Sequence, residues 1–277
     1  MEPTTLKLHH IVILVKDLQK AIDDYVKLGF TVASGGVHFG GISQNALILL
    51  EDATYLELLA IRPGIKTFLL KALYKTGILG LFRKSRFGMA FRFYGRAFDA
   101  NEGIIDFALL SDDLPGDFSR IRKQGIFLTK PLSAGRHRPD GTVLRWKMLT
   151  PDIKELPFLI TDLKPHIAPD PVAFKHVNGV LGLEGLALVI PEHSYQTMQD
   201  FQNLLGEAPT FMERLNHTIC RFTLNNHFID LIIPGESWEE KQNFQKHGLG
   251  LYTLKFKCSA RPLDWDLKLS HGLMIFD

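Results

Sequence analysis

Apolar and polar residues follow one another along this chain in a pattern that repeats. Residues 8–18, LHHIVILVKDL, form an apolar run rich in β-branched residues, which predicts a strand. Asp17 can cap a helix through DLQKAIDDYVKLG, and Gly29 supplies its stop. Three further strands are predicted in FTVASGGV, SQNALILL and TYLELLAI. The predicted order of elements is therefore β-α-β-β-β.

The same order returns further along the chain. IIDFALLSDDL, residues 104–114, aligns with residues 8–18 without a gap and places Asp106 at the position of His10. A third copy begins at LEGLALVIPEH, and a fourth begins at LGLYTLKFKCS and stops after the single strand LMIFD. Internal repeats outrank other sequence signals. They predict an α+β fold of tandem βαβββ modules, three complete and a fourth truncated, forming curled mixed sheets around a cavity.

These modules divide into two predicted domains. Residues 1–168 hold modules one and two, and residues 169–277 hold a degenerate second domain made of module three and part of module four. A basic insert, residues 62–98, replaces the short connector expected between modules one and two. The second domain is expected to be a scaffold, a dimer surface or a degenerate pocket.

The insert has an unusual charge pattern. The stretch 58–98 contains nine Lys or Arg and no acidic residue. Apolar residues such as Phe68 and Leu73 stand beside Lys71 and Lys75, which predicts an amphipathic helix. A lid over the cavity, a collar for an anionic ligand, a weak membrane-surface contact and a helix packed on the domain with its lysines extended all remain open. In the first two cases the positive field would favour an anionic ligand.

The two adjacent histidines of the first strand cannot share a role. Neighbouring residues of a strand point to opposite faces. His10, Val12 and Leu14 share the concave inner face, whereas His9 falls on the helix-facing side at the end of the strand. We therefore expect His10 to face the cavity and His9 to be structural or solvated.

Glu57 is the most informative polar residue. It lies in the middle of YLELLAI with apolar residues on both sides. A carboxylate is unfavourable in such a strand unless it is paired or bound to a cation.

Together these stretches resemble the vicinal oxygen chelate superfamily, which includes glyoxalase I, extradiol dioxygenases and bleomycin-resistance proteins. HIVILVKDL is similar to the opening motif of the superfamily, and YLELLAI is similar to its closing motif with Glu57 at the ligand position. More narrowly, residues 8–190 resemble the glyoxalase-like domain proteins. The resemblance implies paired modules whose concave sheets face one another across a cavity, with metal ligands on the first and last strands of each module.

Carried onto this chain, the resemblance implies a metal site with His10, Glu57 and Asp106 as ligands, while Phe158 stands at the fourth position. Such a set suits a divalent Zn, Ni, Mn or Fe ion and leaves room for water or substrate. The alternative is that His10 hydrogen-bonds Glu57 or Asp106 directly and no metal binds.

Further candidates for binding a substrate come from two hairpins. HFGGISQN places His38 and Asn45 near the cavity mouth, although a plain hairpin with polar surface residues is equally compatible with this stretch. GRHRPDGTVLRW contributes Arg136, Arg138 and Trp146. Either arginine could hold a carboxylate bidentately, and the tryptophan could instead belong to the core.

Composition narrows the class of protein. The 277 residues are 45% hydrophobic and 22% charged with a formal net charge of +2, so nucleic acid is not an expected partner. The two cysteines have no paired spacing, which favours reduced thiols. Neither a signal peptide nor an apolar run long enough for a membrane span is present, so a cytoplasmic location is the expectation. Phosphate-loop, dinucleotide and nucleophile-elbow motifs are absent from the sequence.

The leading hypothesis is a glyoxalase-like protein, a metal-dependent lyase, isomerase or dioxygenase, that acts on a small anionic oxygen-rich molecule. Glu57 would be a metal ligand or a general base. The alternative is a metal-free protein that binds or sequesters a small molecule, as bleomycin-resistance proteins do. A homodimer is a further expectation, because the truncated fourth module leaves strand edges that invite partners.

Overall fold

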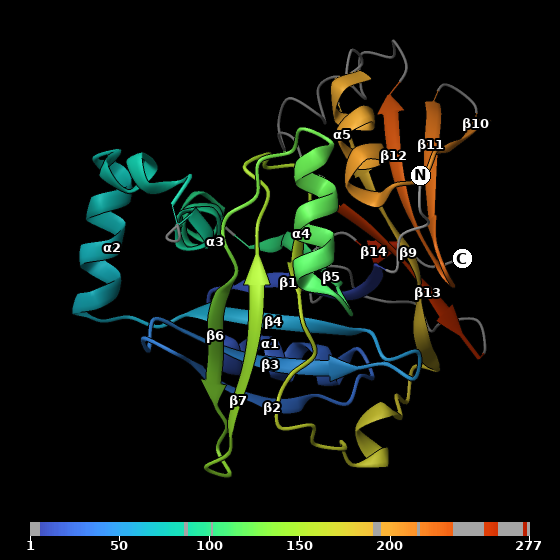
Figure 1. Cartoon of the computed structure of the whole chain (residues 1–277). Coiled ribbons are helices and arrows are strands. Elements are labelled where there is room, and N and C mark those ends of the chain that lie inside the picture. Colours follow the sequence, from blue (N-terminus) through green and yellow to red (C-terminus); the bar gives the residue numbers. More distant parts are fainter. Residues whose placement is uncertain are drawn as a thin grey trace.

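Figure 1 shows the computed structural model of the chain, with an N-terminal barrel and a C-terminal sheet. The structure describes residues 6–85, 88–100, 102–190, 195–214, 217–234, 252–259 and 274–275. The predicted α+β class is confirmed, since helices pack against curled sheets of mixed strand direction.

The first β-α-β-β-β unit forms as the sequence predicts. Its elements are β1 (Lys7–Val15), α1 (Leu18–Lys27), β2 (Ala33–His38), β3 (Ser43–Leu49) and β4 (Tyr55–Ile61). The Asp17 carboxylate accepts a hydrogen bond from the Lys20 backbone N–H and so caps α1. Gly29 follows the helix with φ +85°, a conformation that favours glycine.

The insert and the second unit come next. The insert forms α2 (Ile65–Lys75), the 3₁₀ helix η1 (Ile78–Phe82) and α3 (Gly88–Asp99). The second unit comprises β5 (Gly103–Leu110), α4 (Leu114–Lys123), β6 (Leu132–His137), β7 (Val143–Leu149) and β8 (Phe158–Ile160). Asp113 caps α4 by accepting from the Gly116 N–H, in the same way as Asp17 caps α1.

The two units close into one barrel with the strand order β1-β4-β3-β2-β6-β7-β8-β5. Two antiparallel pairings join the units, β1 with β5 and β2 with β6. The β1 faces are those expected: Ile11 and Ile13 pack with Tyr25 of α1, whereas Val12 and Leu14 lie in a second cluster with Met89 of α3. The barrel therefore has an outer core under its helices and an inner core of its own.

The C-terminal sheet has the order β10-β11-β12-β9-β13-β14. Its elements are the 3₁₀ helix η2 (Pro171–Phe174), β9 (Val180–Val189), α5 (Tyr195–Leu205), β10 (Thr210–Arg214), β11 (His217–Leu224), β12 (His227–Pro234), β13 (Tyr252–Cys258) and β14 (Met274–Ile275). The order from β9 to β12 is again β-α-β-β-β. The number of modules and the domain boundary after residue 168 stay predictions, because much of the expected fourth module lies outside the described residues.

Several polar contacts join the sheet to the barrel, among them those of Asp52. The Asp52 carboxylate, in the turn before β4, accepts from the Leu183 backbone N–H at 2.7 Å and lies 3.2 Å from His227 Nε2. Within the described part of the chain, no helix is long and apolar enough to cross a membrane.

Candidate functional site

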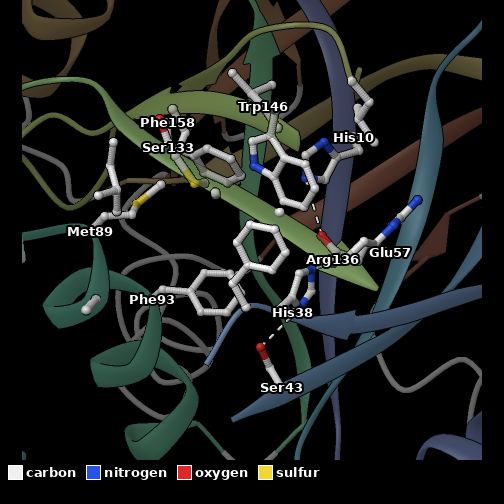
Figure 2. Close-up of a pocket in the computed structure, with 18 of the residues that line it drawn as sticks. His10, His38, Ser43, Glu57, Met89, Phe93, Ser133, Arg136, Trp146 and Phe158 are labelled. Carbon is white, nitrogen blue, oxygen red and sulfur yellow. Dashed lines mark hydrogen bonds and ion pairs between the residues drawn. The ribbon is translucent and has the colours of Figure 1, made fainter. Parts of the chain in front are cut away.

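A cavity of about 220 Å³ lies inside the barrel, lined by strands of both units and by α3. Its polar lining includes His10, His38, Ser43, Glu57 and Arg136. Its apolar lining includes Met89, Phe93, Trp146, Met148 and Phe158. Figure 2 shows the polar side chains from the strands and the apolar side chains from α3 gathered around one space. An amphipathic molecule would match such a lining.

Glu57 is the centre of the polar lining. The Asn45 amide donates to Glu57 Oε1 at 2.6 Å, and His10 Nε2 lies 3.4 Å from Glu57 Oε2. His38 Nε2 approaches Glu57 Oε1 at 3.5 Å from the other side. The carboxylate, which the sequence alone indicated must be paired or bound to a cation, is thus held by two imidazoles and an amide.

The surroundings decide the charge of Glu57. Burial opposes its ionisation, but the hydrogen bond from His10, the charges of His10 and His38 and the Asn45 amide outweigh burial and lower the pKa of Glu57 to about 2. Glu57 is therefore a carboxylate at neutral pH and a weak general base.

His38 is better placed to exchange a proton. Its Nδ1 lies 3.0 Å from Ser43 Oγ and its Nε2 faces Glu57. Burial lowers the pKa of His38, the Glu57 charge opposes this shift and the Arg136 charge adds to it. His38 is therefore a neutral imidazole at pH 7, able to accept a proton from a group in the cavity.

His9 lies closer to the site than its position in a strand suggests. The pairing of β1 with β5 shifts register between Leu8 and His10, and this irregularity leaves the two histidine rings in contact with their Nδ1 atoms 2.8 Å apart. His9 is buried rather than solvated, and burial together with neighbouring His10 holds its pKa well below the usual value. A His10 Nε2–H that donates to Glu57 leaves the His10 Nδ1 atom to accept from the Nδ1–H of His9.

Asp106 is also buried, but it is not part of the cavity lining and has its own partners. Arg92 of α3 binds it bidentately, from Nε and Nη2 at 2.9 Å each, and Arg96 Nη1 adds a contact at 2.8 Å. Burial opposes the ionisation of Asp106, but the charges of Arg92 and Arg96 outweigh burial and hold its pKa below the usual range. Asp106 therefore anchors the insert to the barrel.

The donor atoms do not fit the metal site that the resemblance implies. Both oxygens of Asp106 are engaged by arginines, and the phenyl ring of Phe158 packs edge-on against His10 at the fourth position. In the part of the chain that the structure describes, no three His, Cys, Asp or Glu side chains form a group that could hold a metal ion. His10 and Glu57 contact each other directly, with Nε2 3.4 Å from Oε2.

Arg136 brings an unbalanced cation into the cavity. Its side chain is buried, and its Nε has no hydrogen-bond partner among the described residues. The indole Nε1 of Trp146 is a second buried donor without a partner in the same range of residues. Buried donors are normally satisfied. Two donors on neighbouring strands β6 and β7 thus line a cavity that offers room for a ligand.

The other two candidates lie beside the cavity rather than in its lining. Asn45 reaches the site through its bond to Glu57. Arg138 pairs with Asp140 at the turn, with Nε 3.0 Å from the carboxylate. Tyr55, which sequence reasoning missed, stacks on His10 with ring centroids 4.6 Å apart. Its place two residues before Glu57 on the same strand signals the shared face.

The family follows from a comparison of the sequence. A family model described as "Glyoxalase-like domain" matches residues 8–205. The chain belongs to the glyoxalase-like domain family. No curated protein matches it.

Solved structures share the fold at low sequence identity. A hypothetical protein from Staphylococcus aureus superposes with a TM-score of 0.66 and 15% identity, covering 98% of this chain and 99% of that one. A mutant of 4-hydroxymandelate synthase from Streptomyces coelicolor has a TM-score of 0.54 and 15% identity, over 92% and 71% of the two chains. A fusion protein of a xylose isomerase-like TIM barrel and 4-hydroxyphenylpyruvate dioxygenase has a TM-score of 0.52 and 13% identity, over 92% and 37%. The resemblance to the vicinal oxygen chelate superfamily is confirmed.

Proposed function

We propose that this glyoxalase-like protein binds a small amphipathic organic anion in the barrel cavity without a resident metal. Arg136 carries this proposal. Its buried guanidinium forms no ion pair with a carboxylate of the described residues, which is unfavourable, and a bound carboxylate would pair with it bidentately. The Trp146 indole N–H, the second unsatisfied donor of the lining, supports the same anion or a neighbouring oxygen of the ligand.

The rest of the lining supports the apolar part of the ligand. Met89 and Phe93 of α3 and Phe158 of β8 offer side chains without hydrogen-bonding groups. A cavity of about 220 Å³ accommodates a molecule with one ring or a short alkyl chain rather than a large cofactor. The proposed class of ligand is therefore an aryl or alkyl carboxylate.

The proposal is tested by titration of the purified full chain, after treatment with EDTA, with three probes. The probes are 4-hydroxymandelate, its uncharged amide and octanoate, and the readouts are calorimetry and tryptophan fluorescence. At least one carboxylate should bind, the amide should bind weakly, and Arg136→Gln should weaken carboxylate binding about 10- to 100-fold, the range expected for a charged hydrogen bond.

Arg138→Gln is the matched control, because Arg138 lies two residues away on the same hairpin and already pairs with Asp140. It should leave binding unchanged. Binding that vanishes with EDTA and returns with a divalent ion would contradict the metal-free proposal. Equal effects of Arg136→Gln and Arg138→Gln would contradict the role of Arg136.

A second function is favoured by the arrangement around His38. A neutral imidazole that lies between a hydroxyl, Ser43 Oγ, and a carboxylate, Glu57, resembles the arrangement of a general base with its orienting partner. Bound next to Arg136, the organic anion would present an acidic C–H proton to His38 Nδ1, in place of the Ser43 hydroxyl, while Nε2 keeps its proton towards Glu57. Glu57 would then be a positioning residue that holds the imidazole.

Exchange of solvent deuterium into a bound carboxylate tests this second function. His38→Gln should abolish exchange while Arg136-dependent binding persists, and Ser43→Ala should slow exchange without abolishing it. If His38→Gln exchanges the probe as fast as the unmodified protein, the proton-transfer function is wrong and the binding function alone stands.

A further inference from the structure

The insert exposes apolar surface on the outside of the barrel. None of the residues of α2 is buried. Seven of the twelve large hydrophobic residues that are exposed in the described chain lie between positions 65 and 82; they are Ile65, Phe68, Leu69, Leu73, Ile78, Leu81 and Phe82. Phe68 is 68% exposed and Leu81 is 82% exposed. Figure 1 shows α2 projecting away from the barrel strands, beyond α3.

The apolar residues of α2 form one stripe. Ile65, Phe68, Leu69 and Leu73 follow a spacing of three or four residues, which places them on one side of the helix. Lys66, beside the stripe, donates to the Gly40 carbonyl at 3.2 Å. An exposed apolar stripe of this kind, continued by η1, marks an interaction surface.

The charge of the surface restricts its partner. The stretch 58–98 contains nine Lys or Arg and no acid, and the formal net charge of the chain is +2, so the other residues together carry −7. Lys66, Lys71 and Lys75 of α2 are all exposed. The partner must therefore offer negative charge together with an apolar interior.

A second copy of the chain meets this requirement poorly. A twofold interface through α2 would set the same lysines of both copies against one another, and the stretch 58–98 has no acid to pair with them. A bilayer with anionic headgroups offers both components. Apolar side chains enter the acyl boundary while lysines near the surface are attracted to the anionic headgroups. We propose that α2 and η1 dock this protein reversibly onto an anionic phospholipid surface.

The docking surface and the cavity share a neighbour, because α2 packs on α3 and α3 lines the cavity. Tyr74 of α2 donates to Asp99 of α3 and packs against the Phe91 ring with centroids 6.0 Å apart. From the same helix α3, Met89 and Phe93 line the cavity. Docking would place the cavity beside the bilayer, from which an amphipathic anion could partition into it. This last step rests on the proposed function.

Sedimentation of the full chain with vesicles tests the docking. Vesicles of phosphatidylglycerol mixed with phosphatidylcholine should bind the protein at low salt and release it at high salt, and vesicles of phosphatidylcholine alone should bind little. Phe68→Ser combined with Leu69→Ser should weaken binding about tenfold or more, and so should Lys71→Glu combined with Lys75→Glu.

Matched control variants take exposed residues from outside the insert. Val172→Ser with Val177→Ser, and Lys123→Glu with Lys130→Glu, should bind vesicles as the unmodified protein does. Equal binding to both kinds of vesicle, no binding to either, or insert variants that bind normally would overturn the proposal. So would sedimentation velocity showing a dimer that Phe68→Ser with Leu69→Ser dissociates, because a second copy would then cover the surface.

These experiments can refute the docking proposal and the proposed function independently. Arg136 lies inside the barrel, so the Arg136→Gln protein should bind vesicles normally and should bind the carboxylate probes weakly. A protein that binds vesicles but no carboxylate would retain the docking surface and refute only the proposed function.

Discussion

His38 of β2 and Arg136 of β6 are register partners across the pairing that joins the two units of the barrel. Each unit therefore contributes one member of the pair, and neither unit alone builds the polar lining of the cavity. The positive charge of Arg136 opposes protonation of His38, whereas the negative charge of Glu57 favours it. The proton affinity of His38 therefore depends on burial and on one charged residue from each unit, Glu57 of β4 and Arg136 of β6.

Two substitutions should move the His38 pKa in opposite directions. Arg136→Gln removes a positive neighbour and should raise the pKa, and Glu57→Gln removes a negative neighbour and should lower it. Titration of the imidazole by ¹H–¹⁵N NMR measures both shifts. Arg138→Gln, whose charge is balanced by Asp140, is the control and should leave the pKa in place. Shifts in the same direction for both test variants would contradict the electrostatic account.

Acid stability should depend on Glu57. Its pKa falls from 4.5 to about 2 on folding, so its contribution is complete above pH 4.5 and is lost as the pH falls towards 2. The contribution is on the order of 3 kcal/mol. Urea unfolding of Glu57→Gln between pH 6 and pH 2 should show a weaker dependence on pH than the unmodified protein in that window. Parallel curves for the two proteins would place the acid-sensitive group elsewhere.

Asp106 should matter for stability more than for ligand binding. Asp106→Asn leaves the buried Arg92 and the half-buried Arg96 against a neutral group, and loss of one partner of a buried ion pair destabilises by about 3–5 kcal/mol. Asp140→Asn breaks the exposed pair with Arg138 and should change stability by less than about 1 kcal/mol. Denaturant unfolding of both variants measures the difference. A small effect of Asp106→Asn would mean that α3 is not held by this ion pair.

The repeat of β-α-β-β-β was enough to predict the fold and the inner face of β1, because local patterning specifies these strands and the helices that cap them. The pairing of Glu57 was also predictable, since a carboxylate inside an apolar strand is unfavourable without a partner. The closure into one barrel by the pairing of β2 with β6 was not predictable. Only two residues of each strand are paired there, and so short a contact has no recognisable sequence pattern.

The ion pair between Asp106 and Arg92 could not be predicted from the sequence, for a different reason. Its partner Arg92 lies in the insert, where nine similar basic residues offered no sign of which one turns inward. The contact between His9 and His10 depends on a register shift in the pairing of β1 with β5. Strand alternation alone therefore placed His9 too far from the site.

The hydrogen bond from Asn45 to Glu57 can be tested without changing either residue, by a substitution at Gly35. A Cβ atom at Gly35 would lie 2.1 Å from Asn45 Oδ1 and 2.5 Å from the Asn45 carbonyl, so Gly35→Ala must displace Asn45. We expect a loss of about 1–3 kcal/mol in the free energy of unfolding, as for other overpacked sites. The pKa of Glu57 should rise, because the amide that stabilises its charged form moves away. Urea unfolding and carboxyl titration by NMR measure the two effects.

Gly80→Ala is the matched control, because its Cβ would meet only the Phe91 ring at 3.6 Å, an ordinary contact. It should leave the Glu57 pKa unchanged, since Gly80 belongs to η1 and not to the strands around the carboxylate. A Gly35→Ala protein that is destabilised but keeps the Glu57 pKa would show that the two imidazoles alone hold the carboxylate charged. The Asn45 amide would then serve packing rather than the electrostatics of the cavity.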